Sequence, residues 1–242
     1  MRKQMAVAVS VLGLMAGVAY ANDAKQGTQA GWVSINKLIG EDIYNPAGDK
    51  LGEVKDVVIA PAGKVQAVID VNDSDRDIAV SLDRLSARPG HKDDLQMAAS
   101  KEHLKGMAAF TYDKDAHWGV RTVADAHSGT TTIADRDVDR TAGVAMPERM
   151  SLEKMIGRTI VTADGSKIGD VEDVVLDKSG KARQVVIDLD WSTDDVAVDF
   201  NRLTADAKDH DRLVLAGVTK AQMDAMPKWH YDADTVSLKR SK

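Results

Sequence analysis

Gly48-Asp-Lys-Leu-Gly-Glu-Val-Lys-Asp-Val-Val-Ile59 decides the fold, because it returns as Gly165-Ser-Lys-Ile-Gly-Asp-Val-Glu-Asp-Val-Val-Leu176. After each copy comes a short turn with a glycine, and then a second run in which apolar residues alternate with polar ones. Such alternation predicts strands with one buried face, and a glycine turn between two of them predicts a β-hairpin. The chain therefore contains the same hairpin twice, and we expect two small domains.

The alternation breaks at one place in each hairpin. Val54 and Val57 would face opposite sides of a regular strand, and the second copy repeats the irregularity. A β-bulge next to Asp56, and another next to Asp173, would bring the apolar residues back onto one face. Paired carboxylates can do acid–base chemistry. Matching strand positions instead favour a role in capping turns or bulges.

A short helical turn precedes each hairpin. Ser34 opens the first turn and Ser151 the second, and serine is a preferred N-cap residue. A glycine closes each turn, as is usual just beyond a helix end. The repeated glycines and aspartates form a fold signature: Gly40, Gly48, Gly52, Asp56, Gly63, Gly157, Gly165, Gly169, Asp173 and Gly180.

The rest of each half is also repeated. Two further strands follow each hairpin, and then a second helical turn. In the second half, Thr219 and Gln222 have the spacing of a capping box. Phe110 aligns with Trp229, and we expect both rings in the core.

The repeated pattern Leu38-Ile-Gly40, Gly48-x-x-x-Gly-x-Val-x-Asp-Val-Val, Gly63-x-Val-x-x-Val-Ile-Asp resembles the PRC-barrel domain. That family includes the extramembrane domain of the photosynthetic reaction-centre H subunit and the C-terminal domain of a ribosome maturation factor. The resemblance implies a mainly β fold, with two small antiparallel barrels that carry short helical turns and serve docking and assembly. The family has no catalytic residue set, so it implies no enzyme and no cofactor here.

The expected organisation has six parts. They are a signal peptide over 1–21, a leader over 22–31, barrel 1 over 32–113, a flexible linker over 114–149, barrel 2 over 150–233 and a tail over 234–242. Each half has a full set of strand and turn signals, so we expect each barrel to fold alone.

The first residues predict export. A basic start, a short apolar run and Ala19-Tyr-Ala21 are typical of a signal peptide cleaved after Ala21. The mature chain would lie in the periplasm or be secreted, with no transmembrane segment. It would carry 30 basic and 38 acidic residues, and it has no cysteine. An acidic chain is a poor nucleic-acid binder, because phosphate contacts supply most of that affinity.

The candidate sites for chemistry are weak. The acidic stretch Asp73–Asp77 lacks the glycine and the glutamate of an EF-hand loop, and the histidines have no zinc-site spacing, so we predict no metal site and no catalytic residue. Trp191 has no aromatic counterpart in the first half, and Trp118 lies at the edge of the linker. Exposed tryptophans are enriched at binding hot spots. We therefore predict partner contact through Trp191, Asp190, Asp194, Asp195 and Trp118, with packing of Trp191 on its own barrel as the alternative.

The expected function is that of an exported, non-enzymatic module for protein–protein interaction or assembly in the cell envelope. The partner and the oligomeric state do not follow from the sequence. Two alternatives stay open. One is an envelope stress-related protein that binds a small ligand or a divalent ion through the acidic loops, and the other is a hydrolase with an unrecognised site.

Overall fold

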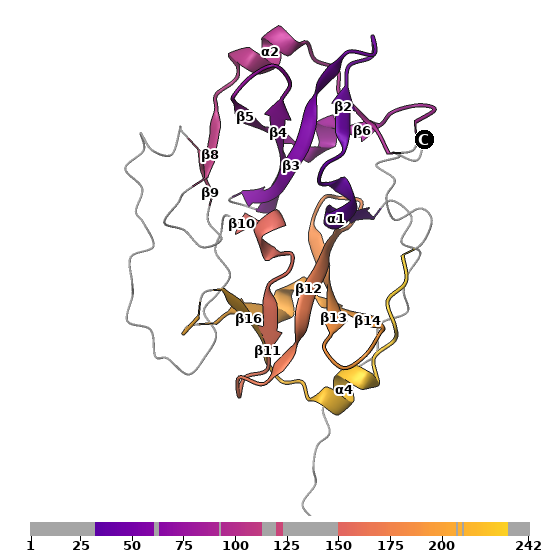
Figure 1. The fold of residues 1–242 in the computed structure, drawn as a ribbon, viewed down its shortest axis with the longest axis vertical. Helices are drawn as coiled ribbons and strands as arrows, with labels where there is room; N and C mark the ends of the chain where they lie inside the picture. The colour runs from indigo at the N-terminus through magenta and orange to yellow at the C-terminus, as the bar shows by residue number, and fades with distance from the viewer. Residues whose placement is uncertain are drawn as a thin grey trace, which may run out of the picture.

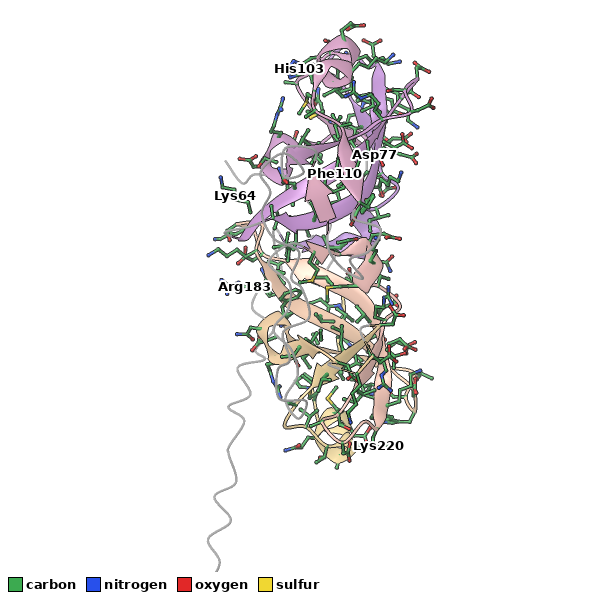
Figure 2. All side chains as sticks on the ribbon, turned by 90° about the vertical axis from the view of Figure 1, so that its left-hand side faces the viewer. Lys64, Asp77, His103, Phe110, Arg183 and Lys220 are labelled. Atoms are coloured by element: carbon green, nitrogen blue, oxygen red, sulfur yellow. The ribbon has the colours of Figure 1, made fainter. Side chains whose placement is uncertain are left out.

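The computed structural model describes residues 32–60, 63–91, 93–112, 120–122, 150–206, 208–209 and 211–231. The predicted signal peptide, leader and tail, and all of the predicted linker except 120–122, lie outside these residues. The two halves lie end to end along the long axis (Figure 1). Figure 2 shows Lys64 and Arg183, at the hairpin ends, near the middle of this axis, with His103 and Lys220 toward its two ends.

Both halves share one succession of elements up to the second helical turn, and the first half adds the strands β8 and β9. The bounds are as follows. The first half has β1 (Val33–Ser34), α1 (Ile35–Leu38), β2 (Asp42–Tyr44), β3 (Lys50–Ala60), β4 (Lys64–Val71), β5 (Asp77–Ser81), η2 (Leu82–Arg84), β6 (Ser86–Ala87), β7 (Leu95–Gln96), α2 (Lys101–Gly106), β8 (Phe110–Tyr112) and β9 (Val120–Thr122). The second half has β10 (Met150–Ser151), η3 (Glu153–Met155), β11 (Thr159–Val161), β12 (Lys167–Leu176), β13 (Ala182–Leu189), β14 (Asp195–Asp199), η4 (Phe200–Arg202), β15 (Leu203–Ala205), β16 (Arg212–Leu215) and α4 (Lys220–Asp224).

Each half curls one sheet into a barrel. The strand order is β5-β4-β3-β2-β7-β6 in the first half and β14-β13-β12-β11-β16-β15 in the second. The two ends of each path are neighbours in sequence, because only η2 separates β5 from β6 and only η4 separates β14 from β15. A short connection between opposite edges requires the sheet to curl, so the predicted fold of two small β-barrels is confirmed.

The pairing inside each barrel is antiparallel except at one place. β2 pairs with β7 in parallel, and β11 pairs with β16 in the same way. The barrels are therefore mainly antiparallel, as expected, with one parallel pair of strands in each. Parallel neighbours need a long crossover connection, and here β3 to β6 or β12 to β15 supply it.

The irregularities expected in the hairpins are present. The register of β3 on β4 shifts between Val54 and Asp56, and β12 on β13 shifts between Val171 and Asp173. These shifts confirm the predicted bulges. Each bulge bends its strand and turns an aspartate to the side where the other half lies, so it positions the residues of the site below.

Two kinds of glycine position confirm the hairpin assignment. A Cβ on Gly52 would lie 2.1 Å from the backbone oxygen of Asp70, and one on Gly169 would lie 1.9 Å from that of Asp188. Only glycine allows the two strands to approach so closely. In the turns, Gly63 has φ of +69°, a conformation that other residues rarely adopt.

The first strand of each half belongs to the sheet of the other half. β1 pairs with β12, in the register Val33 to Leu176, and β10 pairs with β3, in the register Met150 to Ile59. Beyond the strands, α1 packs against β12 and η3 packs against β3. Each barrel is therefore completed by a segment of the other. This arrangement argues against the expectation that each barrel folds alone, which stays a prediction.

The hydrophobic core also contains residues of both halves. A single contiguous cluster contains Ile35 and Leu38 of the first half together with Leu152 and Met155 of the second. Two small clusters lie apart from it: Phe110 covers Val58 and Val68 in the first half, and Trp229 holds the equivalent place in the second. Both rings are buried, as expected from the sequence, and Figure 2 shows Phe110 beside the sheet of the first half.

Candidate interaction site at the junction of the two halves

The junction is the region where β1 and α1 meet the end of β12, and where β10 and η3 meet the end of β3. It contains the same arrangement twice, in opposite directions. The carboxylate at each bulge is the centre of one arrangement, and Asp56 and Asp173 are both fully buried, with 0% of their surface exposed. Buried carboxylates require donors for every oxygen lone pair that water no longer satisfies.

Asp56 obtains its donors from both halves. The backbone N–H of Glu153 donates to Oδ1 at 3.0 Å, and the hydroxyl of Tyr112 donates to Oδ2 at 3.0 Å. The hydroxyl of Ser151 and the N–H of Val57 donate as well. Asp56 thus caps the first turn of η3, an element of the other half.

Asp173 repeats the arrangement in the opposite direction. It accepts the backbone N–H of Asn36 at 2.9 Å and the hydroxyl of Tyr231 at 3.0 Å. The hydroxyl of Ser34 also donates to it. The expectation that the two aspartates cap turns is confirmed, with the difference that each caps a turn of the opposite half.

The two serines connect the turns to the carboxylates. Ser34 Oγ accepts the N–H of Lys37 at 3.2 Å, and Ser151 Oγ accepts the N–H of Lys154 at 3.1 Å. Each hydroxyl also donates its own proton to the buried carboxylate. The predicted N-cap role is confirmed for Ser34. The N-cap residue of η3 is Leu152, one residue after the predicted Ser151, although Ser151 makes the equivalent hydrogen bond. Both serine side chains also hold the halves together.

Each of the two tyrosines that bond to the buried carboxylates also contacts a lysine. The ammonium of Lys154 lies 4.8 Å from the ring centroid of Tyr112, and that of Lys37 lies 4.4 Å from the ring of Tyr231. In both cases the lysine and the tyrosine come from different halves. Each pair adds a cation–π contact to the hydrogen bond that the tyrosine donates.

The buried charge alters the titration of these groups. Burial raises the pKa of Asp56 and of Asp173 above the ordinary value, against the hydrogen bonds, which lower it. Burial, followed by the adjacent carboxylate, also raises the pKa of Tyr112 and Tyr231. Both tyrosines therefore keep their protons at neutral pH and serve as donors.

The predicted partner residues lie elsewhere, in the loop after β13. The indole N–H of Trp191 donates to Asp224 of α4, and the ammonium of Lys220 lies 4.4 Å from the ring centroid. The half-buried ring also packs against the main core. These contacts favour the alternative in which Trp191 packs on its own barrel, and contact with a partner stays a prediction.

The aspartates of this loop form ion pairs within the second half. Asp190 lies 3.0 Å from the ammonium of Lys167, and Asp194 pairs with Lys228. Asp195 starts β14 and is half buried, and burial together with Asp188 raises its pKa. Trp118 lies outside the described residues. The structure therefore assembles four of the five predicted residues on one side of the second barrel.

Within the described residues, no group of three or more histidine, cysteine, aspartate or glutamate side chains could hold a metal ion. An open depression beside β6 is lined by Pro46, Arg84, Ser86 and Gln96, among others. None of the helices in the described part of the chain is both long and apolar enough to cross a membrane.

The sequence analysis predicted the capping roles of the aspartates and serines, but it missed the two tyrosines and the fact that the contacts cross between the halves. Asp56 and Asp173 repeat, and so do Ser34 with Ser151 and Tyr112 with Tyr231. An aspartate, a serine and a tyrosine at matching positions of both copies are a signal that could have indicated that the three side chains form one hydrogen-bonded group.

Comparison with known proteins agrees with this architecture. No curated protein matches the chain. The PRC-barrel domain model matches it twice, over residues 32–104 and 147–222, which together are more than half of its length. The two matches correspond to the two halves, and each includes the exchanged segment, the bulged hairpin and the parallel strand pair. The chain therefore belongs to the PRC-barrel family.

Proposed function

We propose that this chain is an exported, non-enzymatic module for protein–protein interaction or assembly in the cell envelope. The observation that carries the proposal is the junction. Each barrel binds a strand and a helical turn from another barrel, by pairing backbone at the end of β3 or β12 and by placing a carboxylate on the turn. This is protein recognition by strand addition, carried out between two PRC-barrels of one chain.

The membership of the family supports the same class of function, since PRC-barrel domains suggest a module for interaction or assembly. Export rests on the signal-peptide pattern that ends at Ala21. The ion-binding alternative gains no support from the loop after β13, because lysines already pair with Asp190 and Asp194.

In-cell crosslinking tests the proposal at a chosen surface. The chain has no cysteine, so Thr193→Cys labels only the exposed loop that carries Trp191, and Asp75→Cys labels the matching exposed loop of the first half. Each single-cysteine variant is labelled with a photoreactive maleimide and irradiated. The crosslinked products are then identified by mass spectrometry. We expect a reproducible crosslink to another envelope protein from at least one of these positions.

The outcome that contradicts the proposal is equally definite. If no protein is captured through a label on either loop, and none by a general amine crosslinker applied to the tagged chain, the proposed interaction function is wrong. Calorimetry with calcium, magnesium and zinc separates the ion-binding alternative, which predicts saturable heat with the purified chain.

A further inference from the structure

The junction is a self-complementary surface. Each half offers an apolar strand and a capped turn, and each half receives the same two elements from its neighbour. The received strands have matching registers, since Ser34 lies opposite Val175 and Ser151 lies opposite Val58. A surface that is both donor and acceptor of one element forms an isologous contact, the kind that builds symmetric dimers.

The two donor segments are interchangeable in chemistry. Val33-Ser34-Ile35 and Met150-Ser151-Leu152 each place a serine between two apolar residues. All of these side chains are buried in the structure. No contact at the junction therefore requires that donor and acceptor belong to the same chain.

The acceptor surface of each half, which is the end of β3 with Asp56 or the end of β12 with Asp173, requires a segment bound to it. Without the segment from the other half, Asp56 would lose the donors from Ser151 and Glu153 and would keep those from Tyr112 and Val57. The apolar end of β3 and its neighbours in the core would also be open to water. Both losses are costly, so an unoccupied acceptor binds whichever matching segment is within reach.

We propose that a second copy of this chain can occupy the junction in trans, so that two chains exchange their first strands and turns to form a dimer. The proposal rests on the assembly function proposed above and gives it a partner, namely the chain itself. The connection within one chain gives the partner in cis a high effective concentration. Exchange in trans is therefore favoured when chains fold together at high concentration.

Two full-length single-cysteine variants test this exchange. Asn36 and Glu172 are both exposed, and the side-chain N–H of Asn36 donates to the backbone oxygen of Glu172 at 3.3 Å across the junction. Asn36→Cys in one chain and Glu172→Cys in another can be joined by a short bis-maleimide only when the junction forms between chains. The double variant in one chain reports the junction in cis and confirms that the substituted protein folds.

The two variants are unfolded, mixed and refolded over a range of concentrations, with Asp75→Cys in place of Asn36→Cys as the matched control. We expect crosslinked dimers whose yield rises with concentration, little product when folded chains are mixed, and no product with the control. Light scattering of the unmodified chain after the same treatment should show a dimer.

If the double variant crosslinks in cis but the mixed chains give no more dimer than the Asp75→Cys control at the highest concentration, exchange in trans is wrong. This result concerns the purified chain alone. The general interaction function is tested separately, by crosslinks to other proteins in cells. Failure of exchange in trans is therefore distinguishable from failure of the interaction function.

Discussion

Asp56 and Asp173 are the residues on which the junction depends. A carboxylate taken fully out of water is costly unless it is hydrogen-bonded. Here each one accepts hydrogen bonds from a serine hydroxyl, a tyrosine hydroxyl and two backbone N–H groups. The serine and one of the backbone groups belong to the other half, so the two halves must be docked for the charge to be tolerated.

Asp56→Ala should therefore destabilise the whole molecule. The substitution leaves the hydroxyls of Ser151 and Tyr112 and the N–H of Glu153 without their acceptor, and each buried unpaired donor costs about 1–3 kcal/mol. We expect a loss of about 3 kcal/mol or more in the free energy of unfolding, measured by urea denaturation. Tyr112→Phe is the milder control, because it removes one donor and leaves the charge otherwise capped, at a cost of about 1 kcal/mol. Equal stability of Asp56→Ala and the wild type would show that the carboxylate is not a structural element.

Gly52→Val should be among the most damaging single changes in the first half. Its Cβ would lie 2.1 Å from the backbone oxygen of Asp70, a contact that only a shift of β3 from β4 can relieve. Gly106→Ala is the matched control, because a Cβ there meets nothing within 4 Å. We expect a large fall in melting temperature for Gly52→Val and none for the control. Because the halves share one core, the fall should appear in a single transition, and an unchanged second transition would contradict this.

At the scale of elements, the sequence predicts most of the fold. The bulges, the turn glycines, the N-cap at Ser34 and the Thr219–Gln222 capping box depend on local pattern, and all are present. The exchange of β1 and β10 could not be predicted in this way. Both copies carry the same segment and the same acceptor, so the local pattern is identical whether a strand docks on its own half or on the other.

The segment before β2 gives a pH-dependent prediction. Burial, followed by Asp93, Asp94 and Asp42, raises the pKa of Glu41 to about 7. The folded chain therefore binds a proton more tightly here than the unfolded chain does. Ionised Glu41 costs stability above pH 7, and this cost falls as the pH drops through 7 toward the ordinary value of 4.5.

Glu41→Gln removes this charge and should raise the melting temperature at pH 8, with a difference from wild type that vanishes below about pH 4.5. Calorimetry over this range measures it. In the second half Arg158 follows the helical turn in place of Glu41 and pairs with Asp211, so Glu41→Arg should stabilise the chain further at pH 8. A Glu41→Gln effect of the same size at both pH values would contradict the assignment.

Trp191 gives the second prediction at this scale. Its ring packs on the core, and its N–H bonds to Asp224 of α4. We therefore expect Trp191→Ala to lower the free energy of unfolding by about 2 kcal/mol, less than for a fully buried tryptophan. Thr193→Ala, an exposed change in the same loop, is the control. If Trp191→Ala melts like the control while losing a crosslinked partner, the ring serves contact and not packing.

The whole molecule is two barrels that complete each other. The main core is contiguous from one half to the other, and each sheet contains a strand of the opposite half. Cooperative unfolding of the two halves follows from this arrangement, because neither can lose its sheet without releasing a strand that the other needs. The same reciprocity makes the chain suited to assembly, since the surface that joins its halves is one that a second chain also carries.

The most direct test is the rate of hydrogen exchange at the backbone amides of Asn36 and Glu153, resolved by NMR. Both amides lie in the first turn of a short helix, where no acceptor exists within the helix itself. In the structure they donate to Asp173 and Asp56 across the junction. We predict exchange as slow as that of the core strands, with Asp173→Ala accelerating Asn36 strongly. Exchange at the rate of exposed amides in the wild type would contradict the reciprocal junction.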